Sequence, residues 1–311
     1  MATINAVSLQ ARIFNALARP TIKPVLLLYC RGGCALCARL AVAVLEMITL
    51  GFLSRGGLRR AIGGVNCDIV QPSTPGRRTV LYLHGGGFSV HAPNIYRRFG
   101  RLLAERLQAE VVIPDYRLAP RHRYPAGADD CFAVYAALLA AGRQSAGLIV
   151  MGDSAGGNLA LSTLLRARDQ ALPLPACAVM LSPGADLTLS GASHRGNAMA
   201  DPLIPASGLP GIVSQYVDAH LLTTPYVSPL FADFTGLPPL AIHVGSSEVL
   251  LDCARGVAVA AERAGIPVEL KVWQDMPHVF PLLQFIPEAR AAVEETARFV
   301  LSHSSNQEQS P

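Results

Sequence analysis

The chain has 311 residues, 51% of them hydrophobic and only 15% charged, so it can bury a large core and is not an intrinsically disordered protein. Its net charge of +4 rests on arginines scattered along the sequence, without the basic stripe and interleaved aromatic side chains that nucleic-acid-binding surfaces carry. Nucleic acid is therefore not an expected partner.

The first sixty residues are unusually apolar, above all at 24–30 and 40–53. Neither run reaches the ~20 uninterrupted apolar residues that cross a bilayer, and no signal peptide with a cleavage site is recognisable. We therefore expect no integral membrane segment. Residues 1–60 are predicted to form helices that cap a pocket, with weak peripheral contact to a membrane surface as the alternative.

Seven cysteines, an odd number, favour reduced thiols and a cytoplasmic location. Cys30, Cys34 and Cys37 are spaced like metal or redox ligands, but no second Cys/His cluster supplies the remaining ligand of a zinc site. We expect small buried thiols at these positions, no metal site and no organic cofactor.

From residue 65 onward, short apolar runs bounded by turn residues alternate with longer helical segments. The predicted strands are 65–70, 79–84, 110–115, 147–153, 177–183, 240–246 and 268–273. The predicted helices are 94–109, 127–141, 156–170, 249–265 and 288–302. Because the strand runs are continuously apolar rather than alternating, they predict an α/β fold with a mostly parallel sheet covered by helices on both faces.

Residues 184–235 interrupt this alternation, since they are rich in Gly, Pro and Ser and contain one predicted helix at 208–220. We expect a cap insertion that, with residues 1–60, covers the carboxyl edge of the sheet, where open α/β sheets bind ligands. The core then consists of residues 61–183 and 236–302, and the polar tail 303–311 is expected to fray.

The segment Gly152-Asp153-Ser154-Ala155-Gly156 lies directly between a predicted strand and a predicted helix. It fits the G-x-S-x-G nucleophile elbow, in which glycines relieve the crowding around a serine on a strained turn. Ser154 is therefore the predicted nucleophile, placed at a helix start whose dipole favours developing negative charge.

Seven motifs occur in one order along the chain: HGGGF (84–88), DYRLAP (115–120), YPAGADD (124–130), GDSAGG (152–157), VSPLFADFTGLPPL (227–240), GSSEVLLD (245–252) and MPHVF (276–280). Together they resemble the bacterial hormone-sensitive-lipase-like family of α/β-hydrolases over residues 65–300. The resemblance implies an α/β-hydrolase fold with an N-terminal helical cap and a cap insertion after the sixth strand.

The glycine run of HGGGF follows a predicted strand, where this fold places a loop that binds the oxyanion of acyl transfer. The main-chain N–H groups of Gly86, Gly87 and Ala155 are the predicted oxyanion hole, because backbone donors reach the reacting carbon only where no side chain intervenes. His84 is expected to brace this loop by hydrogen bonds rather than to take part in the chemistry. Asp153, beside the nucleophile, is expected to be a packing or hydrogen-bonding residue rather than a second acid.

A serine nucleophile needs a histidine base and an orienting carboxylate, which follow it along the chain in this fold. His278 is the predicted base, since it lies in a short loop after a strand and, by resemblance, in the last family motif. Glu248 occupies the position where family members often carry Asp, and it is the predicted acid. Asp252, one helical turn later, is the rival, and Asp275 is a third candidate.

These residues predict a serine carboxylic-ester hydrolase, and the family resemblance implies short- to medium-chain acyl esters as its small-molecule substrates. An amidase or deacetylase acting on small acylated metabolites is the alternative within enzymes. A ligand-binding protein that kept the fold without the chemistry is the alternative outside them. A homodimer through the edge of an unpaired last strand is also considered.

Overall fold

The computed structural model of the protein describes residues 2–4, 7–32, 35–54 and 57–305. This part of the chain forms one nine-stranded sheet with the strand order β1-β9-β8-β7-β6-β4-β5-β3-β2. The row is parallel from β1 to β5, and β3 and β2 continue it in antiparallel pairing. The strands are β1 (Ala2–Ile4), β2 (Leu58–Ile62), β3 (Val65–Val70), β4 (Arg78–Leu83), β5 (Ala109–Pro114), β6 (Leu148–Asp153), β7 (Cys177–Leu181), β8 (Leu240–Gly245) and β9 (Val268–Trp273).

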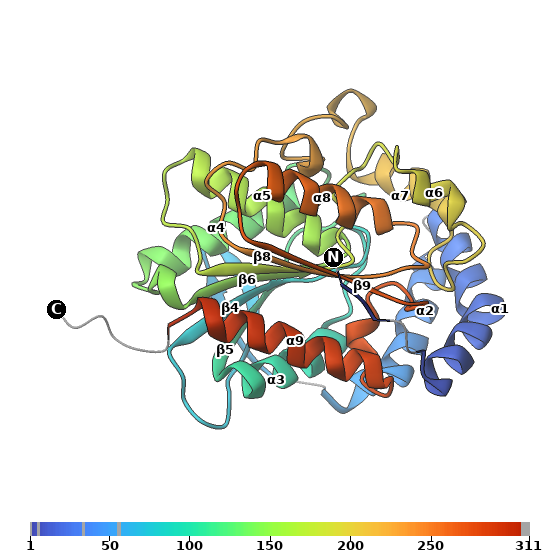
Figure 1. Ribbon diagram of the computed structural model, residues 1–311, viewed down its shortest axis with the longest axis horizontal. Coiled ribbons are helices and arrows are strands. Elements are labelled where there is room, and N and C mark those ends of the chain that lie inside the picture. Colours follow the sequence, from blue (N-terminus) through green and yellow to red (C-terminus); the bar gives the residue numbers. More distant parts are fainter. Residues whose placement is uncertain (1, 5–6, 33–34, 55–56, 306–311) are drawn as a thin grey trace.

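Helices cover both faces of the sheet (Figure 1). One face packs against α3 (Pro93–Leu107) and α9 (Pro287–His303), and the other against α4 (Ala126–Ala140), α5 (Ala155–Asp169) and α8 (Leu251–Arg263). Each face has its own apolar core, and strands β4 to β8 are buried along their whole length. The predicted α/β-hydrolase fold with a mostly parallel, doubly covered sheet is therefore confirmed.

Two strands were not predicted from the sequence. β2 reads Leu-Arg-Arg-Ala-Ile and lies exposed at one edge, so it lacks the apolar run that marked the central strands. β1 pairs with β9 in parallel register, with Ala2 opposite Lys271. The expectation that the last strand is an unpaired edge is therefore wrong, because the N-terminal strand covers it.

The cap segments gather at one end of the molecule, beside the carboxyl ends of the parallel strands (Figure 1). They comprise α1 (Leu9–Gly32), α2 (Ala35–Ile48) and η1 (Gly51–Ser54) from the N-terminal region, and α6 (Ala192–Gly196), η3 (Ala206–Gly208), α7 (Leu209–Tyr216), η4 (Ala219–Leu221) and η5 (Pro229–Phe231) from the insertion. The insertion follows β7, which is the sixth strand when the short β1 is left out of the count. β2 crosses the expected boundary at residue 60, so we propose that the N-terminal cap ends before Leu58.

The first residues of the expected polar tail contact the core, although their composition predicts fraying. Ser304 is buried and its hydroxyl accepts a hydrogen bond from Arg78 Nε at 2.9 Å, while the Ser305 N–H donates to the Ala146 carbonyl at 2.9 Å. Fraying therefore does not begin at residue 303, and the rest of the expected tail, 306–311, lies outside the described residues. Across the described ranges, no helix combines the length and apolarity needed to cross a membrane.

Candidate active site

Ser154 occupies a strained turn between β6 and α5. Its φ of 52° and ψ of −119° lie outside the regions that L-residues ordinarily populate, as in a nucleophile elbow. The turn is held by the Ser154 N–H, which donates to the Leu181 carbonyl at 2.9 Å. A Cβ at Gly156 would overlap the Leu83 carbonyl oxygen, so the helix can follow the serine this closely only with glycine there.

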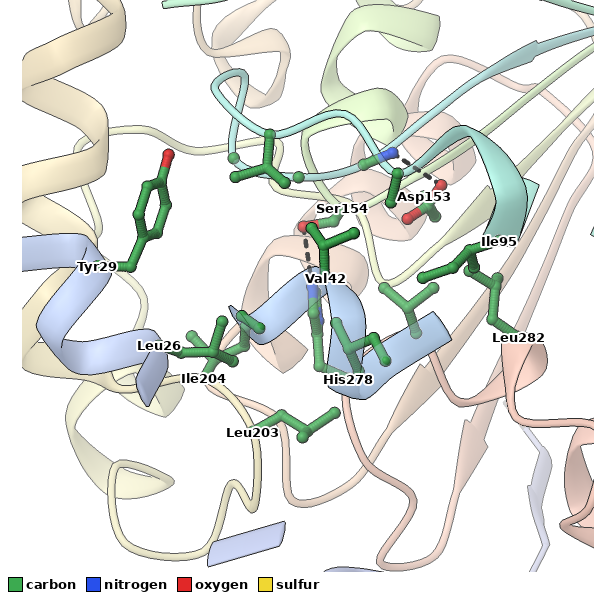
Figure 2. Close-up of a pocket in the computed structure, with 18 of the residues that line it drawn as sticks. Leu26, Tyr29, Val42, Ile95, Asp153, Ser154, Leu203, Ile204, His278 and Leu282 are labelled. Atoms are coloured by element: carbon green, nitrogen blue, oxygen red, sulfur yellow. Dashed lines mark hydrogen bonds between the residues drawn. The ribbon is translucent and has the colours of Figure 1, made fainter. Parts of the chain in front are cut away.

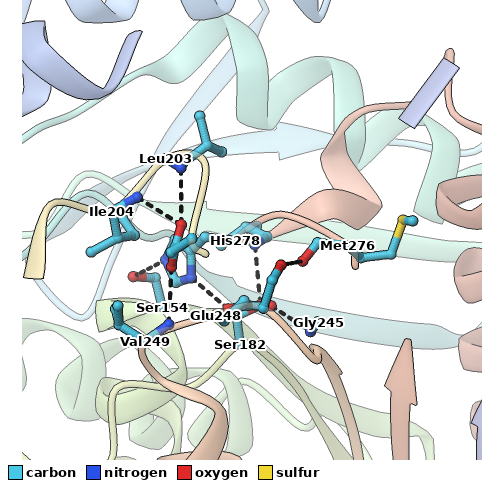
Figure 3. Close-up of polar contacts among 12 residues, drawn as sticks. Ser154, Ser182, Leu203, Ile204, Gly245, Glu248, Val249, Met276 and His278 are labelled. Carbon is cyan, nitrogen blue, oxygen red and sulfur yellow. Dashed lines mark hydrogen bonds and ion pairs between the residues drawn. The ribbon is translucent and has the colours of Figure 1, made fainter. Parts of the chain in front are cut away.

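His278 lies in the loop between β9 and α9 and faces the serine. Its Nε2 is 2.8 Å from Ser154 Oγ, and its Nδ1 is 2.8 Å from Oε2 of Glu248 (Figures 2 and 3). His278 and Glu248 are both buried. Three side chains from three separate loops at the carboxyl edge of the sheet therefore form one continuous hydrogen-bonded series.

Glu248 sits on the tight turn between β8 and α8, where a network of donors fixes its carboxylate. Oε1 accepts hydrogen bonds from the Gly245 N–H at 2.6 Å and from the Ser182 hydroxyl at 2.8 Å (Figure 3). With Oε2 bound to His278, both oxygens have partners, as a fully buried carboxylate requires. The longer side chain of glutamate thus reaches the histidine from a turn that also binds it back to its own backbone.

The two alternative acids point elsewhere. Asp252 Oδ2 accepts the Ser193 N–H at 2.7 Å, so this carboxylate holds the start of α6 in the insertion. The Asp275 carboxylate accepts a bond from Gln274, and its backbone carbonyl accepts one from Asn15 on α1. Although Asp252 follows Glu248 by only four residues, it lies on the first turn of α8, and its carboxylate binds the cap insertion rather than His278.

Ser182 was not singled out from the sequence, yet it links two parts of this network. It directly follows β7, it is fully buried, and its φ is 50°. Besides donating to Glu248, its oxygen accepts the N–H of Val279 at 3.1 Å, the residue after His278. The only sequence signal was a small polar residue at the carboxyl end of a parallel strand, where sites of this fold class lie.

The insertion supports the turn that carries Glu248. Asn197 Nδ2 donates to the carbonyls of Ser246 and Glu248 at 3.0 and 2.8 Å. Asp201 is fully buried, and its Oδ2 accepts the Val249 N–H at 3.0 Å. The acid loop is therefore braced by cap residues about 50 positions earlier in the sequence.

Burial and charge act on His278 and Glu248 in opposite ways. Burial lowers the pKa of His278. The hydrogen bond and negative charge of Glu248 raise it, and the negative charges of Asp201 and Asp153 add to this effect, so the pKa lies above the usual value. Burial raises the pKa of Glu248, while its bonds from His278 and from the Gly245 N–H lower it in part. The pair therefore stabilises an imidazolium at His278, as a general base requires after it takes a proton.

Asp153, beside the nucleophile, fixes the start of the glycine loop. Its Oδ1 accepts the Gly85 N–H at 2.9 Å and the Tyr82 hydroxyl at 3.0 Å, and its Oδ2 accepts the Tyr96 hydroxyl at 3.1 Å. Burial raises the pKa of Asp153 to about 6, and these three donors limit the rise. Asp153 thus has a hydrogen-bonding role, as the sequence analysis expected, and the structure adds that one of its partners is the glycine loop.

The next two glycines line the same cavity as Ser154 and His278. Gly86 has a φ of 114°, and a Cβ there would overlap the Val90 carbonyl oxygen, so only glycine fits. The Gly85 N–H is committed to Asp153, which leaves the N–H groups of Gly86 and Gly87 as the candidate oxyanion donors of this loop. Ala155 is the first residue of α5, and the first N–H groups of a helix have no intrahelical acceptor.

His84 packs against the glycine loop and is not among the residues that line the cavity with Ser154. It is fully buried, its ring stacks on Tyr116 at a centroid distance of 4.2 Å, and its Nδ1 bonds to the Gly85 carbonyl at 2.7 Å. Burial lowers the pKa of His84 to about 3, with the neighbouring His91 acting in the same direction. His84 is therefore neutral at ordinary pH and supports the loop.

A cavity of about 230 Å³ opens above Ser154 and His278. Its walls are almost entirely apolar and come from the cap helices, the insertion and the loop after β9, with Leu26, Val42, Leu203, Ile204 and Leu282 around the serine and histidine (Figure 2). Tyr29 on α1 donates its hydroxyl to Ser89 Oγ at 2.5 Å and so ties the cap to the glycine loop. The cap thus forms the wall that an apolar ligand would contact.

The cysteines expected to be buried are only partly described. Cys30 is buried, and burial raises its pKa to about 11. Cys34 and the side chain of Cys37 lie outside the described residues. Within the described ranges, no three His, Cys, Asp or Glu side chains cluster as metal ligands would.

The fold and the serine–histidine–carboxylate series define the class of the protein as an α/β-hydrolase. A family model described as alpha/beta hydrolase fold matches residues 80–282. An acetyl-hydrolase of Streptomyces hygroscopicus is 38% identical over 77% of this chain and 80% of its own length, and an esterase of Acinetobacter venetianus is 36% identical over 78% and 80%.

Solved structures that are similar to this chain carry names of the same kind. The crystal structure of the hormone-sensitive-lipase homologue EstE7 from a metagenome library has a TM-score of 0.83 at 34% identity and covers 95% of this chain and 99% of its own. The crystal structure of an esterase from the bacterial hormone-sensitive-lipase family has a TM-score of 0.79 at 34% identity, covering 84% and 90%. The protein belongs to the bacterial hormone-sensitive-lipase-like family of α/β-hydrolases.

Proposed function

We propose that the protein is a serine carboxylic-ester hydrolase that cleaves esters of short to medium acyl chains through an acyl-enzyme on Ser154. The observation that carries the proposal is the hydrogen-bonded series from Ser154 through His278 to Glu248, with both links at 2.8 Å. Nucleophilic acyl transfer needs a serine, a base and an orienting carboxylate in this order. The esterases among the relatives support the ester as the bond that is cleaved.

In the first half-reaction, Ser154 Oγ attacks the ester carbonyl carbon while His278 Nε2 takes the hydroxyl proton. Glu248 holds the imidazole with its Nδ1–H toward the carboxylate and stabilises the imidazolium that forms. His278 then returns the proton to the leaving alcohol as the ester C–O bond breaks. A water molecule, deprotonated by His278, attacks the acyl-enzyme, releases the carboxylic acid and restores Ser154.

The oxyanion of both tetrahedral intermediates would be bound by the N–H groups of Gly86, Gly87 and Ala155. These amides are part of the backbone beside the nucleophile, so they need little reorganisation as charge develops. Each donor of this kind is worth about 10²–10³ in rate.

The cavity supports an acyl chain of limited length. The cavity of about 230 Å³ is small and its walls are apolar, so an acyl chain fills it after a limited number of methylene groups. Burying one methylene contributes about 0.8 kcal/mol, so kcat/KM of p-nitrophenyl esters is expected to rise about fourfold per methylene until the cavity is full. A series from acetate to laurate tests this, and a continued rise to laurate would contradict the size limit.

The direct test of the proposed nucleophile is Ser154→Ala, assayed with p-nitrophenyl butyrate. Hydrolysis is expected to fall about a millionfold, because the acyl-enzyme cannot form. Ser162→Ala is the matched control, since Ser162 is a buried serine on the helix that follows the nucleophile. Near-normal hydrolysis by Ser154→Ala, in protein that elutes and melts like the native chain, would reject the assignment.

We also propose that the protein works in the cytoplasm. The odd number of cysteines supports a reducing compartment, as do the five described thiols, which are free and buried. Thiol titration of freshly isolated protein under denaturing conditions tests this, with seven reactive thiols expected. A homodimer through the edge of the sheet loses its original support, because β1 already pairs with β9.

A further inference from the structure

Exposed apolar side chains are concentrated on the N-terminal cap. Ten of the sixteen large hydrophobic side chains that are exposed among the described residues lie between residues 9 and 53. They are Leu9, Ile13, Leu17, Leu28, Leu36, Leu40, Met47, Leu50, Phe52 and Leu53. Exposed leucines scattered singly are ordinary on protein surfaces, but ten large apolar side chains exposed on one cap segment indicate an interaction surface.

These side chains form a stripe on each cap helix. At about 100° of rotation per residue, the four on α1 fall within an arc of about 100°, and the three on α2 within about 40°. We call these seven, Leu9, Ile13, Leu17, Leu28, Leu36, Leu40 and Met47, the outer cap surface.

The opposite faces of the same helices point inward. Ala11, Ala18 and Ile22 of α1 are buried, and Val42 and Leu45 of α2 line the cavity above Ser154. The cap helices therefore carry apolar side chains on two faces. One face is accounted for by the cavity and the core, and the other faces outward.

The charged residues are also unevenly distributed between the cap segment and the rest of the chain. Six of the 26 basic residues but only one of the 22 acidic residues lie in residues 1–56, so this segment carries +5 and the rest of the chain −1. The net positive charge of the protein therefore comes from residues 1–56. Arg12, Arg19 and Lys23 lie on one flank of the α1 stripe, and Arg19 and Lys23 also bond to insertion carbonyls.

An apolar stripe flanked by basic residues is the pattern of a helix that lies in a membrane interface. A second copy of the chain would bring another +5 against this surface, whereas anionic headgroups complement it. We propose that the outer cap surface docks on an anionic lipid surface, which brings the cavity of the proposed esterase next to esters dissolved in the lipid. The docking is argued from the outer cap surface alone. Only the supply of lipid-dissolved esters to the cavity depends on the proposed function.

The test compares two pairs of substitutions on exposed helix faces. Ile13→Gln/Leu17→Gln removes two members of the outer cap surface, which are 51% and 60% exposed. Val259→Gln/Leu301→Gln, at 43% and 44% exposure on α8 and α9, is the matched control. None of these four residues lines the cavity, and glutamine is a good helix former, so folding and hydrolysis of p-nitrophenyl butyrate are expected to persist in both variants.

Binding is measured by co-sedimentation with vesicles of phosphatidylcholine alone or with roughly one third phosphatidylglycerol. Each basic residue near the surface is worth about fivefold in affinity, so the native chain is expected to bind the anionic vesicles at least tenfold more tightly than the neutral ones. The cap variant is expected to bind them about ten- to a hundredfold more weakly than the native chain, and the control variant within about twofold of it.

Four outcomes would overturn the proposal: no binding of the native chain, equal binding to both vesicle types, equal losses in both variants, or a cap-dependent dimer in sedimentation equilibrium without vesicle binding. Ser154→Ala is expected to bind vesicles like the native chain, so loss of hydrolysis and loss of docking are separate results. In the activity arm, the cap variant is expected to lose hydrolysis of tributyrin emulsified with phosphatidylglycerol while keeping p-nitrophenyl butyrate hydrolysis.

Discussion

Replacing Ser182 by alanine tests whether the proposed acid is held in place by the strand end beside it. The substitution removes the donor to Glu248 Oε1 at 2.8 Å and leaves the Val279 N–H without its acceptor at 3.1 Å. A hydrogen bond to a charged group contributes about 1.5–3 kcal/mol. If most of that energy holds Glu248 and the loop of His278 in the reactive geometry, kcat falls about tenfold to hundredfold when it is lost.

Two further readouts separate positioning from general damage. Ser182 is buried outside the lining of the cavity, so KM is expected to stay within about twofold. With one donor fewer, the Glu248 carboxylate presents more of its charge to His278, so the pKa of His278 rises further and the acid limb of kcat/KM moves to higher pH.

The control for this prediction is Ser162→Ala, which also deletes a buried serine hydroxyl. Ser162 Oγ has no hydrogen-bond partner among the described residues, so its loss is expected to leave kcat, KM and the pH profile unchanged. The reasoning is refuted if Ser182→Ala keeps kcat within about twofold, or if it lowers kcat without moving the acid limb while Ser162→Ala does the same.

Three other predictions follow from the site. Glu248→Gln is expected to lower kcat about 10⁴-fold, because His278 loses its orienting carboxylate. Asp252→Ala is expected to keep kcat within about threefold and to lower Tm by a few degrees through loss of the Ser193 contact. Equal kcat losses in the two variants would reject Glu248 as the acid. The acid limb of kcat/KM in the native chain is expected above pH 6.5, because the pKa of His278 is raised and the base is protonated below that pKa. Glu248→Gln is expected to move the limb to lower pH. A limb well below pH 6.5 in the native chain would contradict this. Gly86→Ala is expected to lower kcat about 10²–10³-fold with an unchanged circular dichroism spectrum, because its Cβ would collide with the Val90 carbonyl and displace the loop; full activity would exclude this amide as an oxyanion donor.

The central fold could be predicted because its signals are local. Continuously apolar runs bounded by turn residues mark the buried strands. The observed β6 begins one residue later than predicted, and α5 begins and ends one residue earlier. β2 escaped prediction because an edge strand needs no apolar run. β1 escaped it because three residues carry too little pattern to recognise.

The same difference between local and long-range signals decides which residues of the candidate site could be predicted. Ser154 and its glycines could be found because a tight turn imposes its own local sequence. Ser182 and Asp201 could not, since their roles depend on partners 66 and 48 residues away that only the folded chain brings together. The sequence could not decide between Glu248 and Asp252 either, because they are only four residues apart and the choice depends on how the turn after β8 and the start of α8 are placed relative to His278.

The most direct measurement of the account is the site of covalent modification by an organophosphate ester such as paraoxon. Attack by an activated serine transfers the diethylphosphoryl group to its oxygen and releases p-nitrophenol, so one group per chain is expected on the peptide that contains Ser154, in proportion to the activity lost. His278→Ala is expected to remain unlabelled over the same time. Complete inactivation with the group on any other residue, or rapid labelling of Ser154 without His278, would contradict the proposed mechanism.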